Sequence, residues 1–363
     1  MVSSVNITNL MLPEQFSLSS YNFDLNPSRI AQNPASRRID SKLLNGLSNS
    51  LQDCQFSQLS SLVSTIFPQG VLFVTNNTEV LRARLMGRKV SGGKVEALLF
   101  ESQEDSLWKG LFKPGRRLHI GTEIHFSESN YGVIEGKHAD GTMTMRWYGK
   151  DSVLSFMQNN GILPLPPYIQ NFEGDPQRYQ TVYAKVPGAS AAPTAGLHFN
   201  QEIMNELRDL GCDFAELTLH VGPGTFKPIE EQDIRNYKIH GEWIDVSEDC
   251  IRRIKLARAN SKPIICIGTT ALRSLETVER LNGLSQAWQG VTNIYIYPDQ
   301  KIKSCDYLLT NFHLPFSSLL VLVAAFTGFD LYKKIYNHAI SSEYRFFSFG
   351  DCMLLKNNSG LDK

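Results

Sequence analysis

The sequence lacks the features of a membrane protein, a disulfide scaffold and a zinc protein. Its longest apolar run, Leu319–Phe326, is far shorter than the roughly 20 residues that span a bilayer. The six cysteines are scattered and none forms a C-x-x-C pair, so the spacing of a structural zinc site is missing. The N-terminal segment has neither a basic region nor a small-residue cleavage pattern. We therefore expect a cytoplasmic protein with reduced cysteines, no signal peptide and no metal.

Net charge is also missing, because 36 Lys and Arg balance 36 Asp and Glu. This balance excludes a generically basic nucleic-acid coat and an acidic tail protein. It hides an uneven distribution: between Arg82 and Arg117, nine basic residues face only four acidic ones. Such a region attracts a phosphate backbone, although an ordinary solvated face has the same composition.

The 363 residues, 42% of them hydrophobic, are enough for a buried core and suggest two domains. From Val71 to Tyr148, short runs of alternating polarity are separated by turn signals, which predicts a small antiparallel barrel or sandwich. After Pro187, helix and strand patterns alternate, which predicts a layered α/β sheet. We therefore expect an α/β domain (residues 1–68 and 152–363) interrupted by an inserted antiparallel β-barrel (residues 69–151).

Helix capping signals define the elements expected in the α/β domain. Asn200, Ser247 and Ser317 are typical N-caps, and Thr269 and Thr270 open a further helix. The apolar runs predict strands over Phe214–Val221, Pro263–Gly268 and Ile294–Tyr297.

Two common nucleotide-binding motifs are absent. The loop His220-Val221-Gly222-Pro223-Gly224-Thr225 contains Gly-x-Gly, but no third glycine completes G-x-G-x-x-G, and the Walker sequence is missing. This loop nevertheless follows a strand, where ligands of α/β sheets bind, and its glycines permit close approach to the backbone.

Three other stretches carry candidate chemistry. Pro193-Thr194-Ala195-Gly196-Leu197-His198 places an imidazole beside small residues, either as a binding loop or as a tight turn with a packed histidine. The helix opened by Thr269 and Thr270 would offer free N–H donors to a carboxylate, and Arg273 and Glu276 share a helix face. The alternative is a capped helix with an exposed ion pair. His240 and Glu242 would project to one face of a strand, as an acid/base pair requires.

Together these stretches resemble the S-adenosylmethionine:tRNA ribosyltransferase-isomerase family of queuosine biosynthesis. The resemblance extends along nearly the whole chain and rests on long, specific motifs: PLPPYI, YQTVYA, PTAGLHF, TLHVGPGTF, GTTALRSLE, TNFHLP and YRFFSFGD. It implies transfer and isomerisation of the ribosyl part of S-adenosylmethionine onto 7-aminomethyl-7-deazaguanine at the tRNA wobble position. The product is epoxyqueuosine, and adenine and methionine leave. It also implies an α/β domain with an inserted barrel and no metal or separate cofactor, since S-adenosylmethionine is a co-substrate.

The resemblance and the chemistry together give the candidate residues. A base must remove a proton beside the sulfonium, and protonation of adenine would help it leave. The candidate catalytic residues are His198, His220, His240, Glu242 and His313. The candidate substrate-binding residues are Thr194, Gly196, Gly222, Gly224, Thr225, Thr269, Thr270, Arg273, Glu276, Asn311, Arg345 and Asp351. The candidate tRNA contacts are Arg38, Lys42, Arg82, Arg84, Lys113, Arg116 and Arg117.

The chain departs from the family pattern at several positions. Glu79 stands where the family usually has arginine, Arg82 where it has proline, and Asp299-Gln300 where it has Gly-Tyr. Two alternatives to the transferase follow. Glu79 motivates a tRNA-binding relative with impaired or lost catalysis, and the zero net charge motivates a nucleoside enzyme that uses no RNA.

Overall fold

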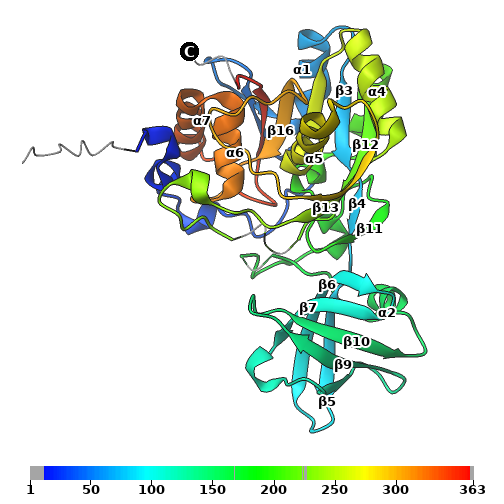
Figure 1. The fold of residues 1–363 in the computed structure, drawn as a ribbon. Helices are drawn as coiled ribbons and strands as arrows, with labels where there is room; N and C mark the ends of the chain where they lie inside the picture. The colour runs from blue at the N-terminus through cyan, green and yellow to red at the C-terminus, as the bar shows by residue number, and fades with distance from the viewer. Residues whose placement is uncertain (1–11, 167, 223, 225–226, 360–363) are drawn as a thin grey trace, which may run out of the picture.

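The computed structural model describes residues 12–166, 168–222, 224 and 227–359. It consists of an α/β domain and a β-barrel, which lies below that domain in Figure 1. The expected fold class, a layered α/β domain interrupted by an antiparallel barrel, is confirmed.

The α/β domain contains a nine-stranded sheet with the order β15-β13-β12-β3-β14-β16-β17-β1-β2. Its strands are β1 (Lys42–Gly46), β2 (Gln52–Gln55), β3 (Leu72–Asn76), β12 (Asp213–Leu219), β13 (Glu242–Val246), β14 (Ile264–Ile267), β15 (Trp288–Thr292), β16 (Tyr307–Asn311) and β17 (Cys352–Lys356). The central strands β12, β3, β14 and β16 are parallel. Their carboxyl ends therefore meet at one edge of the sheet.

Helices cover both faces of this sheet (Figure 1). They are α1 (Leu59–Ile66), α3 (Gln201–Asp209), α4 (Glu248–Ala259), α5 (Gly268–Asn282), α6 (Ser318–Thr327) and α7 (Phe329–Ser341). The core on one face joins Leu72 and Val74 to α4, α5, α6 and α7, and the core on the other face joins Phe73 to α1 and α3. This alternation along β3 is the period of two that a strand buried on both sides requires.

The barrel closes in the order β10-β7-β6-β5-β8-β9. Its strands are β5 (Arg84–Lys89), β6 (Lys94–Glu104), β7 (Leu107–Lys113), β8 (Glu123–His125), β9 (Asn130–Lys137) and β10 (Met143–Gly149). Met143, Met145 and Trp147 occupy alternate positions of β10, and all three are buried in the barrel core.

The insert begins and ends later than expected. Strand β3 was assigned to the barrel but lies at the centre of the large sheet. Strand β4 (Thr78–Val80) pairs with β11 (Val186–Ala189) in a two-stranded sheet that connects the two parts. Helix α2 (Val153–Asn160) buries Val153, Phe156 and Met157 in the barrel core. The inserted unit thus spans about 84–160 instead of 69–151.

The predicted caps are confirmed at Asn200, Ser247 and Ser317, each of which accepts a hydrogen bond from a backbone N–H of its helix. The strand predicted over Ile294–Tyr297 is wrong, because the strand lies earlier, at β15.

Candidate active site

Most of the motifs that suggested chemistry lie at the carboxyl ends of the parallel strands. His220 follows β12, Thr269 and Thr270 follow β14, and His313 follows β16. This edge is where ligands of open α/β sheets bind. The residues nevertheless divide into separate groups, which differ in their partners and in their burial.

The first group is the Arg273 cluster, which we define as Gly222, His240, Glu242 and Arg273. Glu242 is only 3% exposed and accepts hydrogen bonds from the Arg273 guanidinium and, at 3.1 Å, from the Gly222 N–H. Nε2 of His240 lies 3.6 Å from Oε1 of Glu242. The predicted contact between His240 and Glu242 is confirmed, although His240 precedes β13 instead of lying within it.

The Glu242 carboxylate is kept ionised by its partners. Burial by itself would raise its pKa, but the charges and hydrogen bonds of Arg273 and His240 together outweigh that effect and lower the pKa to about 2. A buried carboxylate of this kind requires its cation, because either charge left alone would be costly.

The glycine loop packs directly on His240. A Cβ at Gly224 would lie 2.7 Å from Nδ1 of His240, which is closer than real side chains approach. Gly224 therefore allows the imidazole to lie against the backbone, whereas Gly222 contributes its N–H to Glu242. Thr225, the next candidate in this loop, lies outside the described residues.

The N-terminus of α5 also has free hydrogen-bonding capacity. No side chain caps it, since the N-cap position is Ile267. Within the described residues, Oγ1 of Thr270 and Nη2 of Arg273 are buried and have no hydrogen-bond partner. Free N–H groups, a hydroxyl and a guanidinium nitrogen together form a suitable environment for an anionic ligand.

The second group surrounds His198, in the 3-10 helix Thr194–His198. The Asn311 amide donates to Nε2 at 3.1 Å, which places the imidazole proton on Nδ1, 2.7 Å from Oγ of Ser41. Thr194 in turn donates to Oδ1 of Asn311. Burial, with Arg345 and Arg38 nearby, lowers the pKa of His198 to about 3, so this ring stays neutral at physiological pH.

Gly196, in the same turn, has a packing role. A Cβ there would lie 2.0 Å from the hydroxyl oxygen of Tyr183. Substrate binding is therefore not needed to explain this glycine.

His220 lies apart from Glu242. Its N–H bonds to the carbonyl of Trp243, and its ring stacks on Trp243 with centroids 5.1 Å apart. Because successive residues of β13 point to opposite faces, His220 and Glu242 lie on different sides of the sheet. Burial lowers the pKa of His220 to about 4, and Nδ1 contacts Oγ1 of Thr78 at 2.8 Å.

His313 is buried between the sheet and α7. Its N–H donates to the Tyr336 hydroxyl, and Nε2 lies 3.2 Å from Oγ1 of Thr310. Burial lowers its pKa to about 3. Of the four candidate histidines, His240 is thus the one in direct contact with a buried carboxylate.

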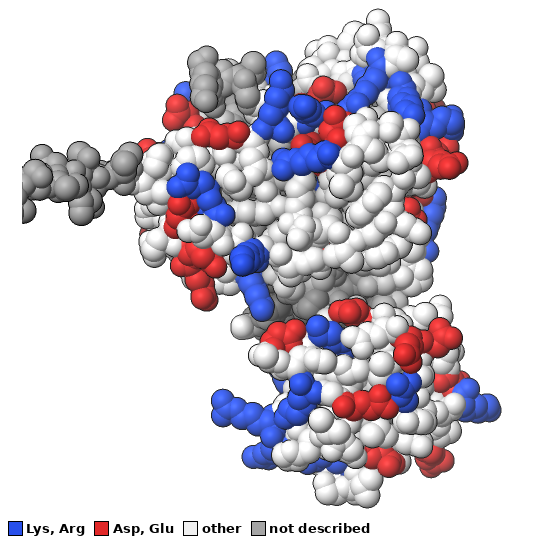
Figure 2. Space-filling view, viewed as in Figure 1, with Lys and Arg blue, Asp and Glu red and all other residues white. Residues whose placement is uncertain are grey.

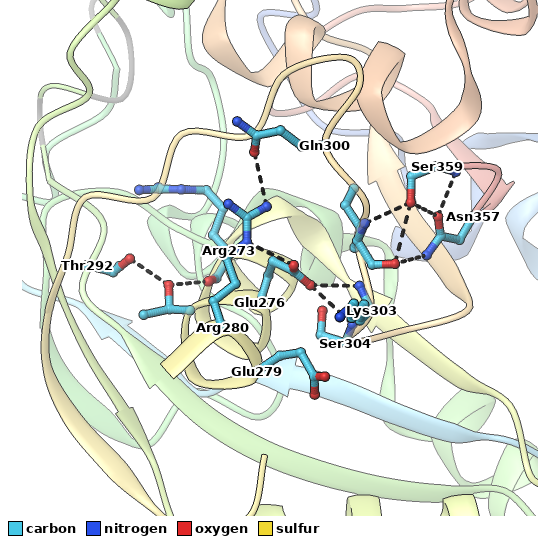
Figure 3. Close-up of polar contacts among 12 residues, drawn as sticks. Arg273, Glu276, Glu279, Arg280, Thr292, Gln300, Lys303, Ser304, Asn357 and Ser359 are labelled. Atoms are coloured by element: carbon cyan, nitrogen blue, oxygen red, sulfur yellow. Dashed lines mark hydrogen bonds and ion pairs between the residues drawn. The ribbon is translucent and has the colours of Figure 1, made fainter. Parts of the chain in front are cut away.

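The alternative interpretation of Arg273 and Glu276 as an exposed ion pair is wrong. Glu276 is 1% exposed, pairs with Arg280 and accepts hydrogen bonds from the N–H groups of Lys303 and Ser304 (Figure 3). It holds the loop 303–304 against α5, which is a structural role. Gln300, at one of the family departures, accepts a hydrogen bond from Arg280 in the same network.

Four further candidates are used in structural contacts. Asp351 is buried and accepts hydrogen bonds from the N–H groups of Lys42 and Arg345. The Arg345 side chain lies 3.5 Å from that carboxylate. Lys42 donates to the Ser342 carbonyl and lies over the Tyr344 ring.

Arg38 donates to the carbonyls of Leu197, Gln177 and Gln180, and burial lowers its pKa. Arg38 and Lys42 thus make structural contacts within the α/β domain, and their contact with tRNA stays a prediction.

The remaining basic candidates lie on or near the barrel. Lys113, Arg116 and Arg117 are exposed, at the end of β7 and in the 3-10 helix that follows. Arg84 pairs with Glu96 at 3.6 Å, and Arg82 lines a cleft between β4 and α2 together with Glu79. Figure 2 shows basic side chains projecting from the left side of the barrel in this view.

Sequence reasoning missed Ser41 and Asn76. Ser41 orients His198, and the buried Asn76 bonds the backbone of Leu219 and so fixes the end of β12 beside β3. Each partner is more than 100 residues away in the sequence, so local sequence patterns do not indicate these contacts.

In the described part of the chain, no group of three or more His, Cys, Asp or Glu side chains is arranged to hold a metal ion. No helix among the described residues is both long and apolar enough to cross a membrane.

Comparison with known proteins identifies the family. The family model described as "Queuosine biosynthesis protein" matches residues 18–355. An S-adenosylmethionine:tRNA ribosyltransferase-isomerase from Thermosynechococcus vestitus is 42% identical over 94% of this chain and 97% of its own length. The enzyme of that name from Thermotoga maritima is 41% identical over 93% and 99% of the two chains.

The fold agrees as well. A crystal structure of S-adenosylmethionine tRNA ribosyltransferase from Thermotoga maritima matches with a TM-score of 0.53 and 32% identity, covering 93% of this chain and 99% of that one. With the motifs and the inserted barrel, these similarities show that the chain belongs to the queuosine biosynthesis family of S-adenosylmethionine:tRNA ribosyltransferase-isomerases.

Proposed function

We propose that this protein transfers the ribosyl moiety of S-adenosylmethionine to 7-aminomethyl-7-deazaguanine at the wobble position of tRNA and isomerises it to epoxyqueuosine. Adenine and methionine are released. Family membership supports the reaction. The observation that carries the assignment of the site is the Arg273 cluster beside the uncapped N-terminus of α5.

The methionine carboxylate of S-adenosylmethionine binds at the start of α5. The unpartnered Oγ1 of Thr270 and Nη2 of Arg273 support this placement, because both are buried donors beside free backbone N–H groups. Arg273 then spans two carboxylates, that of Glu242 and that of the substrate.

His240 is the residue that moves protons. The reaction needs a group that takes a proton from the carbon beside the sulfonium or gives one to departing adenine. His198, His220 and His313 are held neutral by burial, and their ring nitrogens bond to neighbouring groups. The side chain of His240 is 30% exposed and lies beside ionised Glu242, which orients the ring.

The tRNA binds the exposed basic residues of the barrel, Lys113, Arg116 and Arg117. Salt-sensitive contacts with phosphates position an RNA without reading its sequence. A partner of this kind supports the cytoplasm as the location of the protein.

The reaction uses no metal and no cofactor besides the co-substrate, because the sulfonium itself activates the neighbouring carbon. We expect adenine release to continue in the presence of a chelator, provided that the tRNA is prefolded and its folding is checked. Loss of turnover that is restored by one particular divalent ion would overturn this part of the proposal.

The experiment that tests the function is incubation with S-adenosylmethionine and tRNA that carries the aminomethyl base, followed by measurement of adenine. Release that depends on that tRNA supports the transferase. Tight tRNA binding without adenine release would support the alternative of a catalytically impaired relative. Turnover of a free nucleoside without tRNA would support the nucleoside enzyme.

A further inference from the structure

A row of three aromatic rings crosses the outside of the barrel. The strand register places His125 of β8 opposite Tyr131 of β9, and Tyr131 opposite Tyr148 of β10. These side chains alternate with buried neighbours such as Ile124 and Trp147, so they face outward from the barrel core. Figure 1 shows β9 and β10 side by side in the barrel.

The three rings form a continuous stack. The centroids of Tyr131 and Tyr148 lie 5.2 Å apart at an interplanar angle of 15°, and those of His125 and Tyr131 lie 5.6 Å apart at 25°. Stacked neighbours restrict each ring, so the column is preorganised and little side-chain entropy remains to be lost on binding. We name these three residues the aromatic column.

The two ends of the column differ. At the His125 end the next strand continues the row, because Arg88 of β5 lies opposite His125. At the Tyr148 end the ladder between β10 and β7 stops at Arg146 opposite Leu107, so no β7 residue pairs with Tyr148. Tyr148 is 40% exposed, which leaves part of a large ring in contact with water.

Charges of both signs lie around the column: Glu123 contacts His125, and a cation lies near each end. Arg88 at one end and Lys150, two residues beyond Tyr148, are both exposed. The barrel strands and their connections, residues 84–149, contain ten Lys and Arg against eight Asp and Glu. A flat π-face flanked by cations binds an unpaired base by stacking and its phosphates by charge.

We propose that Tyr148, at the open end of the aromatic column, stacks on an unpaired nucleobase of the RNA substrate. The proposal rests on the proposed function, since it takes tRNA as the ligand. It adds a site that distinguishes unpaired nucleotides from paired ones. The bound base extends the column by one ring. The basic residues of the barrel bind the phosphates on either side of that base.

Equilibrium binding of tRNA to Tyr148 variants tests the proposal. Stacking of one base on one aromatic ring corresponds to an affinity change of about 5- to 150-fold. We expect Tyr148→Ala and Tyr148→Leu to raise the Kd for tRNA within that range, and Tyr148→Phe to stay within about twofold of wild type. Tyr148→Leu keeps apolar bulk against Tyr131 but removes the π-face, so it separates stacking from packing.

Ile120→Ala is the matched control, because Ile120 is an exposed apolar residue of the same barrel and is expected to leave binding unchanged. A fully paired RNA of similar length provides a second control, and thermal melting shows that each variant is folded. Unchanged tRNA affinity in folded Tyr148→Ala would overturn the proposal, as would an equal loss of affinity for the paired RNA.

Wild-type adenine release, measured in parallel, separates this proposal from the proposed function. Adenine release by wild type, together with a tRNA affinity that is unchanged in Tyr148→Ala, would overturn the stacking site alone. Binding that depends on Tyr148 without release supports the stacking site and overturns the transferase activity.

Discussion

The charged residues singled out in the α/β domain and those singled out in the barrel lie in opposite environments. In the α/β domain, Glu242, Arg273, Glu276 and Asp351 are all buried and hydrogen-bonded to other groups. In the barrel the core is apolar, and Lys113, Arg116 and Arg117 are exposed. Preorganised charges in a dry site stabilise reacting groups, whereas exposed cations release counterions when they bind a phosphate backbone. The comparison supports the proposal that the α/β domain carries out the chemistry and the barrel binds the RNA.

The largest effect is expected on breaking the buried pair. Arg273→Ala leaves the Glu242 charge without its main partner, which should cost about 3–5 kcal/mol of stability and abolish adenine release. Denaturant unfolding measures the first effect. The double variant with Glu242→Gln should recover part of the lost stability, because no charge is then left unpaired.

Arg235→Ala is the control for that experiment, because Arg235 pairs with Asp233 on the surface and such pairs contribute about 0–1 kcal/mol. Equal destabilisation by the two arginine variants would contradict the contrast between buried and exposed charge.

His240→Ala should affect chemistry more than stability. General acid–base catalysis contributes about 10²- to 10⁴-fold, so the rate of adenine release should fall within that range while binding of S-adenosylmethionine stays near wild type. His119→Ala, an exposed barrel histidine, serves as the control. A rate unchanged by His240→Ala would exclude His240 as the proton-transfer group.

Acid should destabilise the α/β domain through its buried groups. The folded pKa values of His198, His220 and His313 lie below the ordinary value of 6.5, so their contributions are complete above pH 6.5 and are lost as pH falls toward 4 and 3. The Glu242 contribution is complete above 4.5 and is lost as pH falls toward 2.

Each such histidine adds about 1.4 kcal/mol per pH unit to the slope of unfolding free energy below pH 6.5. His220→Gln should therefore flatten the slope between pH 6 and 4, which unfolding at a series of pH values measures. A slope identical to that of wild type would mean that His220 is not held neutral in the folded protein.

The smallest effect on stability is expected from the barrel cations. Replacing Lys113, Arg116 and Arg117 with alanine should change stability by about 0.5 kcal/mol or less but weaken tRNA binding. If all three contact phosphates, the slope of log K against log salt should fall by about 2 to 3. An unchanged slope would remove these residues from the RNA interface.

Local signals in the sequence predicted the parts of the fold that depend on neighbouring residues. Asn200, Ser247 and Ser317 are local signals of this kind, because each side chain accepts a hydrogen bond from a backbone N–H in the first turn of the helix that follows it. Strand β3 was misplaced because its partners, β12 and β14, lie more than 130 residues away, while turn-rich barrel sequence follows it directly.

The same difference between contacts of sequence neighbours and contacts of distant residues applies to the site. His240 and Glu242 are two residues apart, and their contact was predictable. Arg273 was expected to accompany Glu276 on one helix face, yet it reaches Glu242 on a different strand. Spacing along a helix allows the pairing of Glu276 with Arg280, four residues on, but it cannot show that Arg273 pairs with Glu242 from another strand.

Adenine release by wild-type protein and by His240→Ala, with and without tRNA that carries the aminomethyl base, tests the central claim most directly. The account predicts adenine from wild type only when that tRNA is present, and a loss of at least about 100-fold in the variant with S-adenosylmethionine binding retained. Adenine release at the wild-type rate from His240→Ala, or from wild type without tRNA, would contradict it.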